Sequence, residues 1–314
     1  MNEILVETRD LSRRYGDHIA VNHIEFSISK GEVLGFLGPN GAGKTTTMQM
    51  ITGNLAPTTG TIRIAGHDLL DEPRAAKNEI GYLPENPPLY RDMTVDEYLD
   101  YCAGLNRIPG KQRKDAREQT KQKCGLTDSG DRLIGNLSKG YQQRVGLAQA
   151  IIHNPAVIIL DEPTVGLDPI QIREIRALIR ELGKNHGIIL CSHILPEVQA
   201  ICNRVQIINH GELVLSEATN NLAKHMQSAS LTAAFREPAD EAALAQLPGV
   251  TRVQMMDERR AHIFYEGDQD PTDAVVCLAM DKHWGLSELT PGQVSLEEIF
   301  VQLTLSDDDK ETGA

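Results

Sequence analysis

Short apolar runs alternate with longer polar stretches over the first two thirds of the chain. Runs of about five mostly apolar residues occupy Val33–Leu37, Ala156–Leu160 and Gly187–Cys191. Such runs are typical of strands that are buried on both faces of a parallel sheet. Helical stretches separate them, so the pattern predicts an α/β fold.

Further strands are expected around this parallel sheet. Ile4–Leu11 and Ile24–Ile28 alternate apolar and polar residues, as strands at the edge of the domain do. Gly60–Asp68 has the flanking glycines of a hairpin, and Ile80–Glu85 forms a strand that Pro84 ends.

The pattern becomes helical after the proline-rich turn that follows Glu85. Thr94–Glu97 has the form of a capping box, which predicts a helix start. The charged run Lys111–Lys123 is interpreted as a solvated helix face. A helical subdomain over about residues 88–155 is therefore expected between the strands of the sheet.

A different order of elements follows Glu217. The pattern predicts strand, helix, strand, strand, helix, strand, which resembles a ferredoxin-like unit. His262 and His283 lie here without a catalytic partner pattern. The expected strands are Ser230–Phe235, Thr251–Met256, Ala261–Glu266 and Leu286–Leu289, and the expected helices are Ala239–Leu247, Thr272–Trp284 and a closing Ser295–Leu305.

The chain of 314 residues is long enough for about two domains. We expect a nucleotide-binding domain over residues 1–220, an α+β accessory domain over 221–306 and a disordered acidic tail over 307–314. The formal charge of -13 disfavours a broad nucleic-acid surface, so no nucleic-acid partner is expected. No apolar run reaches the ~18 residues that a membrane helix needs, and work at a membrane would require another chain.

Five cysteines are scattered without a C-x-x-C pair: Cys102, Cys124, Cys191, Cys202 and Cys277. Neither a zinc knuckle nor a disulfide framework is indicated. Buried, reduced thiols in a cytosolic protein are the simplest interpretation.

The segment Gly38–Thr45 fits the phosphate-loop pattern G-x-x-x-x-G-K-[ST], with a strand before it and a helical stretch, Thr46–Ile51, after it. Glycines let successive N–H groups turn toward a phosphate, and the helix start adds the positive end of its dipole. Lys44 would reach the β- and γ-phosphates, and the Thr45 hydroxyl would bind Mg²⁺. The alternative is a glycine-rich turn that happens to contain Lys-Thr. The residues expected at the nucleotide are Gly38, Pro39, Asn40, Gly41, Ala42, Gly43, Lys44, Thr45 and Thr46.

Acidic residues end the second buried strand. Asp161 could hold Mg²⁺ through its water shell, and Glu162 could polarise a water for attack on the γ-phosphate. Two adjacent acids can also form a polar turn. His193 follows the third buried strand, where it is either a structural histidine or a γ-phosphate contact.

Two further residues have open interpretations. Ser138 opens a helix and is either an ordinary N-cap or part of an anion site. Tyr15 lies upstream of the phosphate loop and is either an adenine-stacking aromatic or a half-buried surface residue.

Taken together, the motifs from Met1 to about Ala218 resemble the ATP-binding subunit of ABC transporters. The matching positions are Tyr15 for the adenine-stacking aromatic, Gly38–Thr45 for the Walker A loop, Glu85 for the Q-loop, Leu137–Gln142 for the signature motif, Asp161 and Glu162 for the Walker B aspartate and catalytic glutamate, Val165–Asp168 for the D-loop and His193 for the switch histidine.

This resemblance implies ATP and Mg²⁺ as ligands, with Glu162, His193 and Glu85 catalytic and with Thr45, Glu85 and Asp161 at the metal. It further implies an ATP-dependent head-to-tail homodimer in which Ser138 and Gly140 of one subunit close over the other subunit's nucleotide, with Asp168 also at the site. An integral-membrane permease would be the partner, which places the chain peripherally at the cytoplasmic face of the inner membrane.

Two positions depart from the family's usual residues. Glu85 replaces a glutamine, and the signature motif reads Leu-Ser-Lys-Gly-Tyr, with Lys139 and Tyr141 as the unusual residues. Both variants resemble a bacterial ABC-2-type exporter subgroup that includes gliding-motility and drug-export ATPases. The alternatives are a soluble ABC ATPase of DNA repair or the ribosome, and a catalytically silent binding module.

Overall fold

The computed structural model describes residues 3–219, 221, 230–265 and 269–292. The chain divides into two compact units, Met1–Thr219 and Asn220–Ala314. The expected helix Ser295–Leu305 and the expected tail over residues 307–314 lie outside the described residues.

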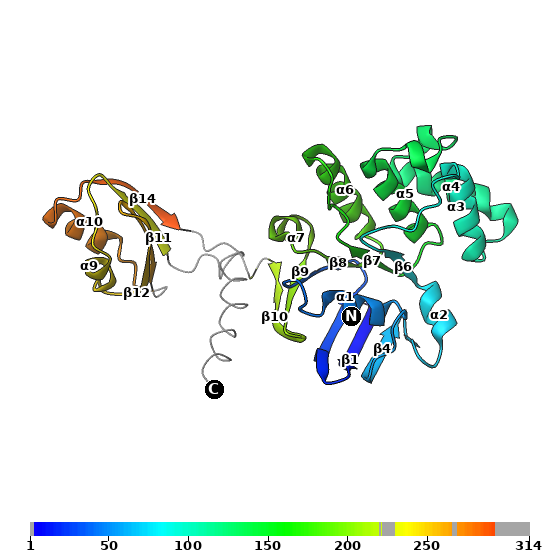
Figure 1. Ribbon diagram of the computed structural model, residues 1–314, viewed down its shortest axis with the longest axis horizontal. Helices are drawn as coiled ribbons and strands as arrows, with labels where there is room; N and C mark the ends of the chain where they lie inside the picture. Colours follow the sequence, from blue (N-terminus) through cyan, green and yellow to red (C-terminus); the bar gives the residue numbers. More distant parts are fainter. Residues whose placement is uncertain (1–2, 220, 222–229, 266–268, 293–314) are drawn as a thin grey trace. The chain divides into compact units, whose positions relative to one another are not determined.

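A six-stranded sheet forms the centre of the first unit (Figure 1). Its strand order is β10-β9-β3-β8-β7-β6, with β10 antiparallel at one edge and the other five strands parallel. Every residue of the central strands β3, β7 and β8 is buried, as the continuous apolar runs predict. The strands are β3 (Val33–Leu37), β6 (Ile80–Leu83), β7 (Val157–Asp161), β8 (Gly187–Cys191), β9 (Arg204–Asn209) and β10 (Glu212–Ala218).

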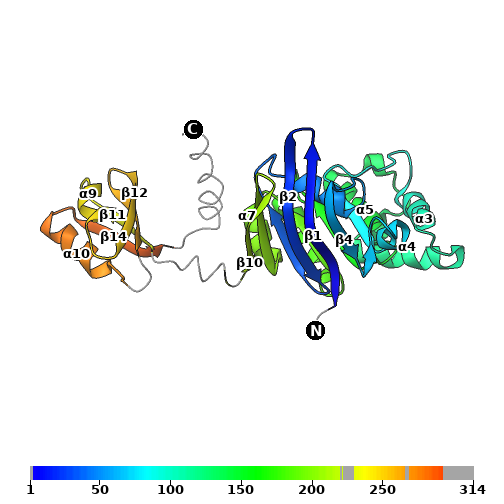
Figure 2. The same cartoon turned by 90° about the horizontal axis from the view of Figure 1, so that it is seen from below.

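A second sheet, antiparallel and of order β2-β1-β4-β5, lies beside it. Figure 2 shows β2, β1 and β4 side by side. Helix α1 (Lys44–Ile51) contacts β2 of this sheet and β7 of the six-stranded sheet. One hydrophobic core joins residues of both sheets with Met48, Met50 and Ile51 of α1. The strands are β1 (Ile4–Tyr15), β2 (His18–Ser29), β4 (Thr59–Ile64) and β5 (His67–Asp68), and α2 (Pro73–Asn78) follows β5.

Three helices in mutual contact form the helical subdomain: α3 (Val95–Leu105), α4 (Gly110–Cys124) and α5 (Lys139–Ile151). Two 3₁₀ turns, η1 (Thr127–Ser129) and η2 (Ile134–Asn136), connect α4 to α5. The Thr94 capping box is confirmed, since the Thr94 side chain accepts from the Glu97 N–H and the Glu97 carboxylate accepts from the Thr94 N–H. Such a cap contributes roughly 1 kcal/mol.

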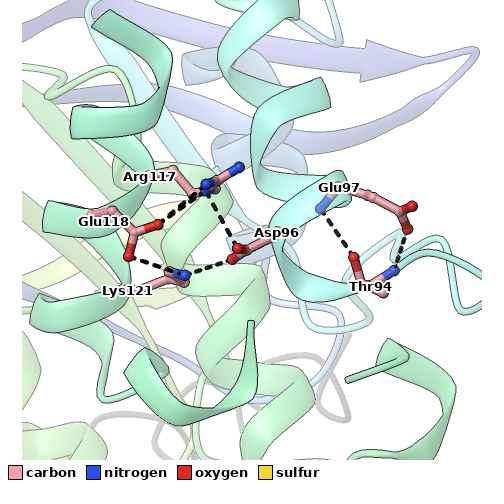
Figure 3. A network of polar contacts seen from close by, with 6 residues as sticks. All are labelled: Thr94, Asp96, Glu97, Arg117, Glu118 and Lys121. Carbon is pink, nitrogen blue, oxygen red and sulfur yellow. Dashed lines mark hydrogen bonds and ion pairs between the residues drawn. The ribbon is translucent and has the colours of Figure 1, made fainter. Parts of the chain in front are cut away.

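The charged face of α4 is not wholly solvated, which corrects the sequence interpretation. Lys121 is buried, with its side chain 5% exposed. Its ammonium lies 2.6 Å from the Asp96 carboxylate on α3 and 3.1 Å from Glu118 (Figure 3). Arg117 lies 3.6 Å from the same Asp96 carboxylate. The ion pairs therefore tie α4 to α3.

Helices α6 (Pro169–Leu182) and α7 (Leu195–Ile201) complete the first unit and contact each other. Asp168 caps α6 and Pro169 begins it, a combination that favours a helix start. Among the described residues, no helix is both long enough and apolar enough to cross a bilayer.

The second unit has the ferredoxin-like order. Its antiparallel sheet runs β12-β13-β11-β14, and its own hydrophobic core includes Phe235, Ile263 and Trp284. The elements are β11 (Ser230–Phe235), α9 (Glu241–Ala245), β12 (Val250–Asp257), β13 (Arg260–Tyr265), α10 (Thr272–Asp281) and β14 (Leu286–Gly292).

Several expected boundaries were wrong. The helix after the phosphate loop begins at Lys44 and not at Thr46, because Gly43 with φ 107° already turns the chain. Helix α10 ends at Asp281, since the chain turns at His283 with φ 57°.

The expectation of buried cysteines was wrong for Cys277, which is exposed. The other four cysteines are buried as expected.

Candidate active site

The register of the parallel sheet brings distant polar residues to one edge. Asp161, the last residue of β7, lies opposite Cys191, the last residue of β8. Leu83 at the end of β6 lies opposite Leu160. The segments that leave these strands carry Glu85, Glu162 and His193, and β3 leads into the phosphate loop at the same edge. Ligands of open α/β sheets bind at this edge.

The phosphate loop needs its glycines. Gly41 and Gly43 have φ of 83° and 107°, a region that side chains disfavour. A Cβ on Gly38 would lie 2.4 Å from the Ile208 carbonyl oxygen, so no side chain fits there. The path of the loop backbone therefore requires glycine at these three positions.

The start of α1 has the features of an anion site. It has neither a side-chain cap nor an acidic residue in its first turn, so its first N–H groups and dipole suit a phosphate. The Lys44 ammonium donates to the carbonyls of Gly38 and Pro39, at 2.7 and 3.0 Å, and the residue is only 9% exposed. Thr45 is exposed and Thr46 half-buried beside it.

Three carboxylates gather at the sheet edge. Asp161 is 9% exposed, and burial raises its pKa, with the Glu162 and Glu85 carboxylates raising it further and Lys44 opposing them. A divalent cation with oxygen ligands would offset this crowding of negative charge. Mg²⁺ prefers oxygen ligands, and the carboxylates of Asp161 and Glu85 and the hydroxyl of Thr45 are such ligands.

Glu162 is held in a defined position. Its N–H donates to the Cys191 carbonyl at 2.9 Å, and its φ of 48° is unusual for a residue with a side chain. One carboxylate oxygen lies 2.7 Å from Nδ1 of His193, and the other accepts a long hydrogen bond of 3.5 Å from Ser192 Oγ. The Glu162 side chain is 12% exposed and that of His193 is 56% exposed. A carboxylate in contact with an imidazole at a partly open edge suits proton transfer to or from a bound water.

Ser138 and Gly140, the two residues expected to act in trans, lie at the start of α5, and Asp168 lies at the start of α6. Ser138 caps α5 by accepting from the Tyr141 N–H at 3.5 Å, and Asp168 caps α6 by accepting from two N–H groups at 2.9 and 3.0 Å. A Cβ on Gly140 would lie 2.5 Å from the Gln171 side chain of α6. The starts of α5 and α6 are therefore adjacent, and Ser138 is exposed beside them.

Tyr15 and Glu85 lie at more open positions. Tyr15 is the last residue of β1 and is 44% exposed, with the Arg13 guanidinium 4.7 Å from its ring centre. Glu85 lines a cavity of about 420 Å³, whose wall also includes Arg91 and Lys139. Two of this cavity's wall residues, Glu85 and Lys139, are among the three departures from the usual motifs, and the third is Tyr141.

The sequence interpretation did not single out a carboxylate behind the site. Glu197 on α7 is 1% exposed and accepts a 2.5 Å hydrogen bond from Thr164 Oγ1. The sequence does hold one sign of it, because Glu197 adjoins the buried positions Leu195 and Val198 in a short helix.

Known proteins resemble the chain in sequence and fold. Residues 21–165 match the family described as ABC transporter. YxlF of Bacillus subtilis, an uncharacterized ABC transporter ATP-binding protein, is 31% identical over 299 residues, which cover 95% of this chain and 99% of YxlF. The bacitracin transport ATP-binding protein BcrA of Bacillus licheniformis is 39% identical over 70% of this chain and 72% of its own length. The structure of cbiO1 from Clostridium perfringens, part of the ABC transporter complex cbiONQ, is 27% identical and has a TM-score of 0.64, covering 70% of this chain and 90% of cbiO1.

The similarity to YxlF extends over nearly the whole of both chains. The chain belongs to the ATP-binding proteins of ABC transporters, the ATPase subunits that power transport.

Proposed function

We propose that this chain is the ATPase subunit of a bacterial ABC-2-type exporter. The observation that carries the proposal is the 2.7 Å contact between Glu162 and His193 at the edge of the sheet where the phosphate loop begins. The relative BcrA is named for bacitracin transport, which supports a drug-like or peptide cargo.

The phosphate loop and the start of α1 hold the triphosphate of ATP. Lys44 turns its ammonium from the loop carbonyls toward the β- and γ-phosphates, and Tyr15 stacks on the adenine. Thr45, Asp161 and Glu85 hold Mg²⁺. The metal, when bound, neutralises charge on the phosphate oxygens.

Glu162 is the general base for hydrolysis. It accepts a proton from water as the water oxygen bonds to the γ-phosphorus, and the bond from that phosphorus to the β–γ bridging oxygen breaks to leave ADP. His193 orients the Glu162 carboxylate through Nδ1. Its exposed ring is accessible to the γ-phosphate.

A second copy of the chain completes the site. In a head-to-tail homodimer, Ser138 and Gly140 of one subunit contact the nucleotide of the other, with Asp168 beside them. The exposure of Ser138 at an N-terminal helix end supports this role. ATP favours the closed dimer because it binds that state better than the open one.

The membrane partner is an ABC-2-type permease, which places this chain at the cytoplasmic face of the plasma membrane. The cavity beside Glu85 lies where the nucleotide site meets α5 of the helical subdomain. This location suits a surface that passes domain motion to a permease. Lys139 and Arg91 give that surface positive charge next to the Glu85 carboxylate.

Affinity capture from membranes tests the transport role. The Glu162→Gln protein loaded with ATP is the bait, and Lys44→Ala in the same buffer is the matched control that should not hold ATP. We expect a multi-span membrane protein to be captured with the first bait and not with the second. Capture of ribosomes, DNA or only a second soluble copy would contradict the proposal and favour a soluble, non-transport ABC ATPase.

A further inference from the structure

A carboxylate is buried behind the candidate base. Glu197 lies on α7 and is 1% exposed. Isolated buried charges are strongly unfavourable, so a carboxylate at this depth requires hydrogen-bond donors or a cation as partners.

The partners of Glu197 come from two other segments. Thr164 Oγ1, in the turn after β7, donates to Oε2 at 2.5 Å. Arg176 Nη2 of α6 lies 3.4 Å from Oε1. Oε1 accepts no hydrogen bond among the described residues, so the Thr164 contact is the closer and better-formed of the two. Glu197 thus joins α7 to the turn that contains Glu162.

Ser192 links Glu197 to Glu162 directly. Its Oγ lies 3.5 Å from Oε2 of Glu197 and 3.5 Å from Oε2 of Glu162, and it accepts from the Ile194 N–H at 3.0 Å. A hydroxyl has a single proton, so Ser192 can donate to only one of the two carboxylates at a time. Ser192 also precedes His193, the other partner of Glu162.

We propose that Glu197 is a positioning residue for ATP hydrolysis, which holds the turn after β7 against the turn after β8. Through Thr164 and Ser192 it fixes the Glu162 carboxylate in contact with His193. The inference depends on the proposed role of Glu162 as the base. It requires no contact between Glu197 and ATP, so loss of Glu197 should affect turnover and leave nucleotide binding intact.

Steady-state kinetics of full-length variants test this role. We expect Glu197→Gln and Thr164→Val to lower kcat roughly 10- to 100-fold, the scale of a misplaced catalytic group. The KM and Kd for ATP should stay within about twofold, since the phosphate loop is unchanged. Thr164→Ser keeps the hydroxyl and should restore most of the turnover.

Glu32 offers a matched control, because it also pairs with an arginine, Arg204 at 2.7 Å, but precedes β3 at the opposite edge of the sheet. Glu32→Gln should leave kcat unchanged. Unchanged kcat in Glu197→Gln, or equal loss in Thr164→Val and Thr164→Ser, would overturn the inference. If Glu197→Gln does not fold, the Thr164 pair decides. Glu162→Gln is assayed in parallel, because its retained turnover would instead refute the proposed role of Glu162.

Discussion

Asp161 is a buried carboxylate among other carboxylates at the edge of the sheet. Burial and the neighbouring Glu162 and Glu85 carboxylates raise its pKa above the ordinary 3.8. The folded state therefore binds more protons than the unfolded state between the two pKa values, and stability falls as the pH rises through that interval. Above that interval, the ionised Asp161 lowers the stability of the nucleotide-free fold.

Asp161→Asn should consequently raise the melting temperature of the nucleotide-free protein by a few degrees at pH 7 and abolish Mg²⁺-dependent hydrolysis. The gain should shrink as the pH is lowered through the raised pKa of Asp161 toward the ordinary 3.8, because the wild-type carboxyl then becomes protonated in the folded state. Thermal melts in EDTA across this range measure it. The exposed Asp115→Asn serves as control and should show no such trend. A melting temperature that falls in Asp161→Asn at every pH would show that the ionised Asp161 does not destabilise the fold.

At the scale of elements, the ion pairs between α3 and α4 organise the helical subdomain (Figure 3). Lys121→Met would leave the Asp96 carboxylate without its closest cation, 2.6 Å away. Removing one partner of a buried pair costs ~3–5 kcal/mol, and the partial exposure of Asp96 lowers the expected loss to about 1–3 kcal/mol.

Urea unfolding of Lys121→Met measures this loss. Lys184→Met is the control, since its pair with Glu181 is exposed on both sides and such pairs contribute little. Equal stability of the two variants would show that the α3–α4 contact does not depend on Lys121.

The sequence predicted best the strands that are buried on both faces. β3 was predicted with its observed bounds, because both of its faces are buried and its residues are apolar throughout. α6, α7 and the β9–β10 hairpin had no counterpart among the predictions. Most residues of β10 are half-buried, so apolar and polar residues do not alternate along it as they do in a strand with one buried face.

The site was predictable as motifs but not as geometry. The phosphate-loop pattern also indicated the strand before it and the helix after it, because strand, loop and helix follow one another in the sequence. The proximity of Glu85 to Asp161 depends on β6 lying next to β7, and the sequence does not specify the order of strands. The unusual φ of Glu162 and the burial of Glu197 follow from packing that only the fold establishes.

For the whole molecule, the two units have separate hydrophobic cores, one built from residues of β1 to β10 and one around Phe235, Ile263 and Trp284. All the candidate site residues lie in Met1–Thr219. A ligand that binds only the folded form of one unit raises that unit's unfolding temperature.

Calorimetry of the full chain should therefore show two unfolding transitions, of which ATP with Mg²⁺ raises only one. A chain that ends at Thr219 should keep the ATP-responsive transition alone. One transition that shifts as a whole with ATP would show instead that the units unfold together.

We propose that Glu162 at the sheet edge is the general base for hydrolysis of the ATP that the phosphate loop holds. Measuring the Kd for ATP and the turnover of Glu162→Gln side by side tests it most directly. We expect a Kd within about twofold of the wild type and a loss of turnover of at least ~10²-fold, the scale of removing a general base. Turnover within a few-fold of the wild type would show that Glu162 is not the base.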